Sequence, residues 1–576
     1  MKNKYFGTIA LIGGGPASLF IMKHIVEEKL QPESIYIFEK NERLGAGMPY
    51  GKYGAGIEHV ANVSANELPE LAEDFVTYIN RHPAIEFKDF YDGHGINEYQ
   101  VIPRLLLGNY LEEQFSQYIS RAKKMGIDVR VFTNSPVVDI IRKEKEESFE
   151  VVTENEDRQH VGNVIICTGH SWPKRNEQKV KGWYDSPYPP SKFSEVTNHP
   201  VAIRGTSLTA VDAVKTLARH NGYFESKGDE VQYFTNKGSE DFSISLFSLG
   251  GYLPALRFHS EESAYSEGWI MSLEDIYEYK KSHNGFVDLD YVFEINFKKP
   301  LQKRDPDFYE TIRALSIEEF VEKMMEIRDR LDGFELFKAE YAEAEKSIRR
   351  HQSVTWKEAL SAFSYAVNYP AKHFSAEDML RLRKTLMPLI SIIIASLPQS
   401  SYRELIALYN AGKISLIDVD EKSHVEPHDE EGGIYHYTDD EGKEKQEHFR
   451  MYIDAIGQQP IEFNQVPFEG LKDSGMISSG YLRFRSPEQG EESYEKDHTN
   501  IIKADQGNYY LRVKGLNIND YFQALDYYGY PAKGLFIMAV PYIGGLNPDY
   551  SGLDFCDTAG RVVVKALKKS FDEVLL

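Results

Sequence analysis

Near its start the chain places a short apolar run before three glycines and a helix-like pattern. Thr8 to Ile12 alternate little between apolar and polar, which is typical of a strand buried on both faces of a parallel sheet. After Gly13 to Gly15, apolar residues recur at helical spacing as far as Ile25. A second strand pattern then runs from Ser34 to Lys40. This order predicts a βαβ unit.

The turn between the first strand and the helix has the spacing G-x-G-x-x-G, with Gly13, Gly15 and Ser18 at its three positions. The first glycine makes the tight turn, and the second removes a Cβ so that backbone N–H groups can approach a pyrophosphate at the helix N-terminus. Pro16 suits the first helical turn, where its missing N–H costs nothing. The third position has only to be small, and we expect the Ser18 hydroxyl to turn back to helical carbonyls.

An acid follows at the end of the second strand. Glu39 lies 26 residues after Gly13, where a carboxylate can accept hydrogen bonds from both ribose hydroxyls of an adenosine. The alternative is an ordinary βαβ unit with an exposed glutamate at the strand end. The combination of glycines and acid favours a dinucleotide.

The next stretch, RLGAGMPYGKYGAGIEHVANVSANEL from Arg43 to Leu68, resembles bacterial FAD/NAD(P)-binding flavoproteins of the "GxGMxYG … NV" type, which have two dinucleotide-binding domains and are monooxygenase-like. The resemblance implies that the first turn holds the FAD pyrophosphate and that the later loop lines the flavin. Ile102 to Leu111 resembles the family's next helix, with Arg104 and Tyr110. For the stretch from Arg43 to Leu68, the alternative is a plain connecting loop.

A similar plan occurs twice along the chain. After Gly126 come a strand, a charged meander and a closing strand that ends at Thr168-Gly169. After Gly412 the same order ends at Ile456-Gly457. Both closing segments resemble the strand that ends each nucleotide-binding unit in two-dinucleotide flavoproteins, and their glycines let the chain pass close to a cofactor.

A second glycine turn lies between the two copies, in Val201 to His220. It resembles the family's turn for the NAD(P) pyrophosphate, but Ser207 replaces the second glycine, so a relic with packing value only is the alternative. On the following strand Leu249 stands where the family carries an arginine that reads the 2′-phosphate of NADP. Arg204 and Arg257 are nearby substitutes. The choice between NADPH and NADH stays open, with a lean to NADPH.

Residues from about 262 to 411 have long amphipathic helical patterns, such as Ile317 to Leu331. They predict an inserted helical domain that can act as a substrate lid. Four residues of this region could face a substrate, although each is also explained as ordinary structure: Trp356, His373, Tyr402 and Arg403.

The last segment is expected to return to the flavin, with a helix that begins at Leu553. Flavoproteins of this architecture aim such a helix N-terminus at the flavin edge where negative charge develops on reduction. Asn547, Asp549 and Asp554 are candidate polar contacts, and Asp554 serves equally well as a helix N-cap.

Composition narrows the classes of function. A net charge of −23 argues against nucleic-acid and anionic-membrane partners, which need a cationic surface. Two cysteines, Cys167 and Cys556, exclude a disulfide framework and a CxxC relay and favour a reducing compartment. The apolar run from Met387 to Leu397 is shorter than the about 20 residues of a spanning helix. No signal peptide and no Cys/His cluster for a metal occur, so we expect a cytoplasmic protein.

These patterns predict an α/β fold with two Rossmann-like dinucleotide-binding domains and a helical insertion. The expected parts are an FAD-binding domain at 1–195, an NAD(P)-binding domain at 196–260, the helical insertion at 261–411, the NAD(P)-domain return at 412–459 and the FAD-domain C-terminal part at 460–576. The candidate cofactor-binding residues are Gly13, Gly15, Pro16, Ala17, Ser18, Glu39, Lys40, Gly47, Met48, Pro49, Tyr50, Asn62, Val63, Arg104, Val138, Thr168, Gly169, Asn547, Asp554, Gly205, Ser207, Leu208 and Thr209.

The function that follows is an FAD-dependent, NAD(P)H-using oxidoreductase. The leading form is a single-component monooxygenase that hydroxylates a small polar molecule with molecular oxygen through a flavin hydroperoxide. Two alternatives stay open: a flavin reductase or dehydrogenase without oxygen insertion, and a non-catalytic flavin-binding interaction protein. The sequence assigns neither a catalytic residue nor an oligomeric state.

Overall fold

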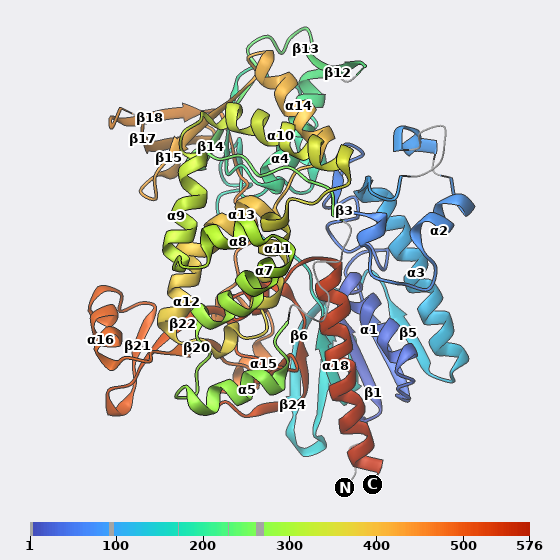
Figure 1. Ribbon diagram of the computed structural model, residues 1–576. Coiled ribbons are helices and arrows are strands. Elements are labelled where there is room, and N and C mark those ends of the chain that lie inside the picture. Colours follow the sequence, from blue (N-terminus) through green and yellow to red (C-terminus); the bar gives the residue numbers. More distant parts are fainter. Residues whose placement is uncertain are drawn as a thin grey trace.

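Two mainly parallel sheets with helices against them form the body of the molecule, and a helical region joins both (Figure 1). The computed structural model describes residues 4–83, 85–90, 97–170, 172–228, 230–260, 270–439 and 441–575. The α/β fold with two Rossmann-like sheets and a helical middle region is therefore confirmed.

The first sheet has six strands and is built from both ends of the described chain. Its order is β23 (Gln523–Leu525), β24 (Pro531–Ile537), β9 (Asn163–Ile166), β1 (Thr8–Ile12), β2 (Ser34–Phe38) and β5 (Asp128–Phe132). All neighbours are parallel except β23, which is antiparallel to β24. Every residue of β1 is buried, as its apolar pattern predicts.

Three long helices pack together beside this sheet. α1 (Pro16–Glu27) joins β1 to β2 and contacts both α3 (Arg104–Lys124) and α18 (Gly552–Leu575). In Figure 1 the red α18 runs alongside the blue α1, so the two ends of the chain lie side by side. Glycines allow the close approach, because a Cβ on Gly560 would lie 3.3 Å from the carbonyl carbon of Phe20.

The second sheet has five parallel strands. Its order is β10 (Trp183–Tyr184), β19 (Met451–Asp454), β11 (Pro200–Arg204), β14 (Ser243–Leu249) and β15 (Ile414–Val419). α4 (Leu208–Asn221) follows β11, as α1 follows β1. The domain boundaries stay a prediction; β10 already belongs to this sheet although it precedes residue 196.

Antiparallel meanders repeat beside the two sheets. The first contains β6 (Val137–Lys143), β7 (Ser148–Thr153) and β8 (Arg158–Val161), and the second contains β16 (His424–Pro427), β17 (Gly433–Thr438) and β18 (Glu444–Phe449). The smaller sheets are β3 (Val60–Ser64) with β4 (Val101–Pro103), β12 (Gly222–Lys227) with β13 (Glu230–Thr235), and β20 (Ser479–Arg483), β22 (Tyr509–Leu516) and β21 (Ile501–Lys503). The repeated plan seen in the sequence is thus present in the fold.

The middle region is helical, as predicted. It contains α5 (Leu273–Ser282), α6 (Leu289–Phe293), α7 (Lys299–Arg304), α8 (Pro306–Ile312), α9 (Ile317–Arg328), α10 (Gly333–Arg350), α11 (Thr355–Val367), α12 (Ala376–Arg381), α13 (Met387–Ile394) and α14 (Gln399–Asn410). Residues 261–269, at the start of the predicted insertion, lie outside the described part of the chain.

This helical region shares its apolar core with the first sheet, although in sequence it lies inside the second unit. Phe293, Phe363 and Leu389 belong to the same buried cluster as Ile9 and Val564. Residues of α10 and α14 pack instead with the second sheet. The helices therefore connect the two Rossmann-like units.

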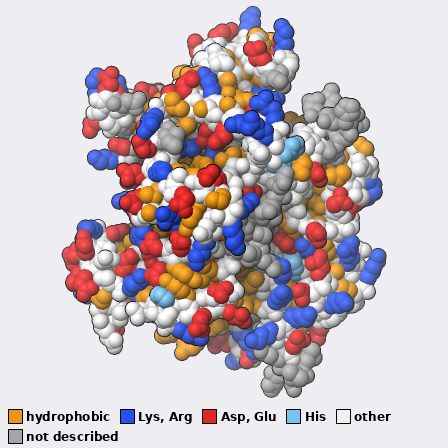
Figure 2. All heavy atoms as spheres, in the orientation of Figure 1, with side chains coloured by type: hydrophobic (Ala, Val, Ile, Leu, Met, Phe, Trp, Pro, Cys, Tyr) orange, Lys and Arg blue, Asp and Glu red, His pale blue; other side chains and the backbone are white. Residues whose placement is uncertain are grey.

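Shorter helices from the early and the late part of the chain complete the first unit. They are α2 (Phe75–Arg81) near its start, and α15 (Glu469–Asp473), α16 (Pro487–Lys496) and α17 (Val540–Ile543) near its end. None of the helices in the described residues has both the length and the hydrophobicity that a bilayer crossing requires. On the face in Figure 2, Lys and Arg side chains are interspersed with Asp and Glu.

Candidate functional site

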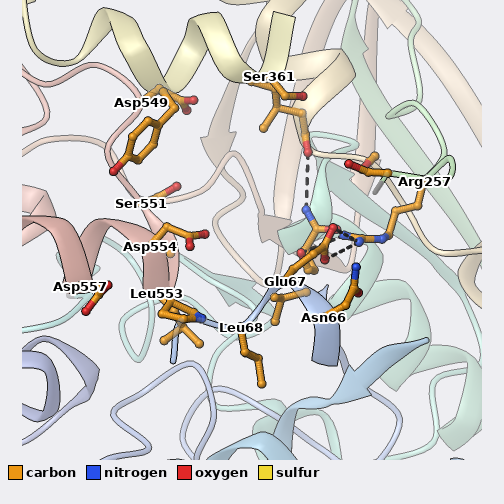
Figure 3. A pocket seen from close by; sticks show the side chains of 18 of the residues that line it. Asn66, Glu67, Leu68, Arg257, Ser361, Asp549, Ser551, Leu553, Asp554 and Asp557 are labelled. Carbon is orange, nitrogen blue, oxygen red and sulfur yellow. Dashed lines mark hydrogen bonds and ion pairs between the residues drawn. The ribbon is translucent and has the colours of Figure 1, made fainter. Parts of the chain in front are cut away.

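A cavity of about 590 Å³ lies where the two Rossmann-like units and the helical region meet. The first unit contributes Tyr50 and Asn62, and the first turn of α18 contributes Asp554. Leu208, at the start of α4, comes from the second unit, and Ser361 comes from α11. Figure 3 shows Asp549, Ser551 and Asp554 on one side of this space and Glu67 with Arg257 on the other. The volume is within the range of small-ligand sites.

The first glycine turn has the conformation that the motif predicts. Gly13 has φ +106°, and a Cβ there would lie 2.7 Å from the Cys167 carbonyl oxygen, so only glycine fits. Gly15 is the N-cap of α1, and no side chain caps the helix. A Cβ on Gly15 would lie 3.4 Å from Cα of Gly47, so the two glycine loops meet backbone to backbone. Uncapped helix amides beside bare backbone suit a pyrophosphate.

The contacts of Ser18 explain why a serine can occupy the third position of the motif. Its side chain is fully buried, and its hydroxyl donates to the carbonyl oxygen of Gly13. The expectation that it would bond a helical carbonyl is wrong, because Gly13 lies in the turn, ahead of α1. The hydroxyl therefore ties the helix to the turn that precedes it.

Glu39 is buried rather than exposed, at 6% of its full accessible surface. Its Oε2 accepts the Gly14 N–H at 2.8 Å, and its Oε1 accepts the Asn41 N–H at 2.8 Å. Each carboxylate oxygen keeps a second lone pair that a ribose hydroxyl could use. The Ser135 N–H donates to the Glu39 carbonyl at 2.9 Å, which brings the segment ahead of β6 to the same place.

Two predicted contacts near Glu39 are on the surface. Lys40 is exposed, and the Val138 side chain on β6 is 43% exposed. Their roles stay predictions.

The loop from Gly45 to Gly51 lies against the first turn. The Gly45 N–H donates to the Gly14 carbonyl at 2.7 Å, and both Gly45 and Gly47 have positive φ. α3 approaches this loop closely, since a Cβ on Gly108 would lie 2.1 Å from the Tyr50 carbonyl oxygen. Tyr50 lines the cavity, and burial raises its pKa to about 12. Met48 and Pro49 lie between these fixed points.

Arg104 does not point freely into the cavity. Its Nη1 lies 2.5 Å from Asp212 Oδ2, and its Nε donates to the Val60 carbonyl at 2.9 Å. The Tyr188 hydroxyl donates to the same Asp212 oxygen at 2.6 Å. This cluster joins α3 of the first unit to α4 of the second, so Arg104 has a structural partner that sequence alone did not reveal.

A neutral histidine reinforces the same interface. Nδ1 of His59 accepts the Gly56 N–H at 2.8 Å, so the proton is on Nε2, which faces the Asp212 carbonyl at 3.1 Å. Burial lowers the pKa of His59, which keeps it neutral. Thr216 of α4 donates to Glu58 Oε1 at 2.6 Å.

The second glycine turn repeats the geometry of the first. Gly205 has φ +105°, its N–H donates to the Phe247 carbonyl at 2.8 Å, and a Cβ there would lie 2.9 Å from the Ala455 carbonyl oxygen. Ser207 is exposed and is the N-cap of α4, without a side-chain cap bond. The helix start is thus open to a ligand despite the missing glycine. Thr209 lies next to Gly457, whose Cβ would be 3.9 Å from its Oγ1.

The two arginines expected to replace the NADP-reading arginine have other partners. Arg257 lies in the cavity, where its Nη2 donates to Glu67 at 2.5 and 2.6 Å and its Nη1 donates to the Asn62 carbonyl at 3.0 Å. Arg204 faces Asp454, with 3.7 Å between Nη1 and Oδ2. Leu249 is 62% exposed at the end of β14.

Carboxyl groups with raised pKa values lie at the start of α18. Asp554 is the third residue of the helix rather than its N-cap, and burial, Glu67 and Asp557 raise its pKa to about 7. Burial raises the pKa of Asp549 to about 6, and this side chain accepts the Ser364 hydroxyl. Perturbed carboxyls in a cavity are typical of functional sites.

Asn547 is buried just ahead of them. Its Nδ2 donates to the Asn368 carbonyl at 3.0 Å, while its Oδ1 has no hydrogen-bond partner within the described ranges. A buried acceptor without a partner is costly, and a ligand donor would relieve it.

The thiols and the helical candidates do not supply reactive groups to this space. Burial raises the pKa of Cys167 to about 12 and raises that of Cys556 further, so neither is poised as a thiolate. Trp356, His373, Tyr402 and Arg403 are absent from the cavity lining within the described residues. His373 instead contacts Asp520 at 3.0 Å, and Tyr402 stacks on Tyr341.

The helical region lines the cavity through a different set of residues. Glu358, Ser361 and Tyr365 of α11 are spaced i, i+3 and i+7 and share one helix face. That spacing is readable in the sequence, but nothing there shows which helix meets the first unit. No group of three or more His, Cys, Asp or Glu suited to a metal occurs in the residues that the structure covers.

The first glycine turn, Glu39 and the glycine loop, with the first turn of α18 in the cavity wall, together fit FAD. At the turn the donors are backbone amides, as a pyrophosphate requires, whereas the cavity wall also carries charged side chains such as Glu67, Arg257 and Asp554. Asn62 and Val63 of β3 line the cavity. Thr168 and Gly169 follow β9 and are not among the described residues that line it, although Thr168 lies against the turn, where a Cβ on Gly13 would be 3.2 Å from its Cα.

Comparison with known families agrees with this fit. Residues 10–171 match the family model described as FAD-NAD(P)-binding, and residues 272–394 match the YdhS-like middle domain. The protein YdhS of Escherichia coli K12, described as uncharacterized, is 26% identical over 472 residues, which cover 81% of this chain and 86% of that protein.

Solved structures are similar in fold at low identity. DfoA bound to FAD, the desferrioxamine pathway cadaverine monooxygenase from Erwinia amylovora, is 10% identical with a TM-score of 0.44, covering 98% of this chain and 95% of that one. An open structure of cyclohexanone monooxygenase is 12% identical with a TM-score of 0.40, covering 98% and 86%. Bacillithiol disulfide reductase Bdr (YpdA) from Bacillus cereus is 11% identical with a TM-score of 0.38, covering 98% and 99%. These values carry no argument about activity.

Proposed function

We propose that the protein is an FAD-dependent, NAD(P)H-using monooxygenase that hydroxylates a small polar molecule. The proposal starts from the matches to an FAD-NAD(P)-binding domain and to a YdhS-like middle domain. The overall reaction converts NAD(P)H, a proton, dioxygen and substrate into NAD(P)⁺, water and hydroxylated substrate. Two electrons from the nicotinamide and two from the substrate reduce the dioxygen.

The observation that carries the proposal is the shared cavity. Tyr50, Asn62 and the first turn of α18 line it from the first unit, and Leu208 lines it from the helix start of the second. A flavin held by the first turn and a nicotinamide held by the second would therefore meet in one space. Proximity of this kind is what hydride transfer needs.

Each part of the site has a role in this proposal. Bound FAD would supply the hydride acceptor and the reduced ring system that activates dioxygen. The turn from Gly13 to Gly15 would hold the pyrophosphate, and Glu39 would hold the adenosine ribose. The N-terminal end of α18 would stabilise negative charge that develops at its side of the cavity.

The wall formed by α11 supports a substrate position in the same cavity. The Tyr365 hydroxyl lies 2.7 Å from Thr558 Oγ1, so this face joins the helical region to α18 by hydroxyl groups. Ser361 and Ser551 add further donors and acceptors. Such a polar lining suits a small polar substrate, and the surrounding helices would keep bulk water away from the reacting atoms.

The absence of a poised thiol favours oxygen or a small molecule as the electron acceptor. Both thiols of the chain have raised pKa values, so a dithiol relay has no thiolate to begin it. A reductase or dehydrogenase without oxygen insertion uses the same cavity and is the competing function. A non-catalytic flavin-binding protein would bind FAD without consuming NAD(P)H.

The test begins with Gly15→Val. Gly15 has φ −83°, so its backbone accepts a side chain, but a branched one would occupy the space between this turn and Gly47. The variant is expected to lose FAD, measured as flavin absorbance per protein after reconstitution, while far-UV circular dichroism and elution volume stay unchanged. A variant that keeps full flavin content would overturn the assignment of this turn.

Isotope-labelled dioxygen then separates the three functions. The wild-type protein with FAD is incubated with NAD(P)H and a panel of small polar compounds. Label in a product supports the monooxygenase, whereas NAD(P)H consumption with all label in peroxide or water supports the reductase. A yellow protein that consumes no NAD(P)H is an interaction protein.

A further inference from the structure

We propose that the second nucleotide site selects NADH over NADPH, and that Asp329 and Asp418 set this preference. The inference rests on the proposed function, because it assigns the coenzyme to the turn at Gly205. It reverses the lean to NADPH that the sequence suggested.

The loop that follows β14 is held against this turn. Thr206 Oγ1 donates to the Tyr252 carbonyl at 2.7 Å and lies 3.2 Å from the Ser248 hydroxyl. β14 is the parallel neighbour of β11, the strand that leads into the turn. In Rossmann-like units the end of this second strand meets the adenosine ribose, where an acid binds the 2′-hydroxyl and an arginine accommodates a 2′-phosphate.

Two carboxylates lie beside the loop, although its strand supplies none. The Tyr252 hydroxyl donates to Asp329 Oδ1, which follows α9. Asp418 on β15 is the register partner of Ser248, so their side chains lie on the same face of the sheet. A Cβ on Gly251 would lie only 3.3 Å from the Asp418 Cβ. The acid that the strand lacks is thus supplied by the neighbouring strand and by the helical region.

The arginines of this neighbourhood are directed to other acids. Arg204 is on the opposite face of the sheet, beside Asp454. Arg328 is buried, with its Nη2 2.8 Å from Glu340 Oε1. Its burial keeps it from reaching a ligand on the surface.

The charge of a 2′-phosphate decides between the coenzymes. A doubly charged group beside two carboxylates is repelled, and the repulsion weakens as salt screens it. A 2′-hydroxyl can instead donate a hydrogen bond to a carboxylate. Specificity of this kind comes from the penalty imposed on the wrong ligand.

The experiment measures NAD⁺ and NADP⁺ binding to the FAD-loaded protein by titration calorimetry at low and at high salt. We expect NAD⁺ to bind at least about tenfold more tightly at low salt, with a smaller ratio at high salt. Initial rates with NADH and NADPH should show the same order in kcat/KM.

Three variants test the inference. Asp418→Asn and Asp329→Asn should each lower the ratio severalfold through tighter NADP⁺ binding, and Leu249→Arg should lower it further by adding a cation at the strand end. Glu441→Gln, which removes one exposed charge at the β17–β18 turn, is the matched control and should leave the ratio unchanged. Flavin content reports whether each variant is folded.

The outcomes separate the inference from the proposed function. Equal or tighter binding of NADP⁺ by the wild-type protein overturns the inference and leaves the proposed function standing. An unchanged ratio in Asp418→Asn or in Asp329→Asn overturns the role of that residue. Binding of neither coenzyme refutes both, because the second turn would then hold no nicotinamide nucleotide.

Discussion

At the scale of single residues, the raised pKa of Asp554 in the cavity makes the stability of the protein depend on pH. Burial, Glu67 and Asp557 raise its pKa to about 7, whereas an unfolded chain has an Asp pKa of about 3.9. Between these values the folded protein keeps a proton that the unfolded chain has released. The stability associated with Asp554 is therefore complete at low pH and is lost as the pH rises to about 7.

Asp554→Asn removes this loss. The variant should gain free energy of unfolding relative to wild type as the pH rises from 5 to 8, by at most about 3 kcal/mol, because the loss in wild type over this window occurs between pH 5 and the folded pKa of about 7. Urea denaturation of the flavin-free proteins at the two pH values measures the difference. A gain that is equal at both pH values would contradict the raised pKa.

Asp557 provides a control with the opposite sign. Lys23 and His24 contact it at 2.7 and 2.8 Å, and its hydrogen bonds to them lower its pKa despite burial. Asp557→Asn should therefore lose stability at pH 8 and less of it at low pH. Asp554 and Asp557 both lie within the first two turns of α18.

Individual roles differed in how far the sequence could predict them. Gly13 and Gly205 were predictable because a tight turn with positive φ needs glycine at a fixed spacing. The partner of Arg104 was not, because Asp212 is more than 100 residues away and only the packing of the two units brings them together. Asp329 and Asp418 were missed for the same reason.

At the scale of elements, the interface between α3 and α4 is held by buried charges. Arg104 and Asp212 are both largely removed from solvent, and Tyr188 and His59 complete the cluster. Removing one member of a buried pair leaves the other charge without compensation, which costs far more than loss of a surface pair.

Asp212→Asn is thus expected to lower the free energy of unfolding by about 3–5 kcal/mol while leaving flavin content unchanged. Glu112→Gln, which breaks the exposed pair with Arg43, should cost about 1 kcal/mol or less. Thermal and urea denaturation compare the two variants. Loss of FAD from a folded Asp212→Asn protein would show instead that the cluster shapes the flavin site.

Local patterns predicted most elements, because the periodicity of a strand or helix depends only on consecutive residues. The two meanders and the helices around Ile317 and Met387 follow from such patterns. These patterns did not predict which helix face lines the cavity. Tyr365 lies near Thr558 only because the helical region shares a core with the first sheet.

At the scale of the whole molecule, the first sheet is complete only with residues from both ends of the described chain. β24 pairs with β9, and α18 packs on α1. A chain ending at residue 530 lacks both elements, so β9 gains an open edge and α1 exposes apolar side chains. We expect this variant to bind no FAD and to aggregate, as size-exclusion chromatography and flavin absorbance would show; a monomeric, yellow product would contradict this.

The same arrangement determines when the protein can acquire its cofactor during synthesis. The turn at Gly13 to Gly15 is translated more than 500 residues before β24 and α18, the strand and helix that close its sheet. Until then the growing chain carries an unfinished sheet, a condition that favours chaperone binding over premature folding. A ligand that needs the closed sheet can therefore be bound only after β24 and α18 have been translated, and FAD that meets a shorter nascent chain finds an incomplete site.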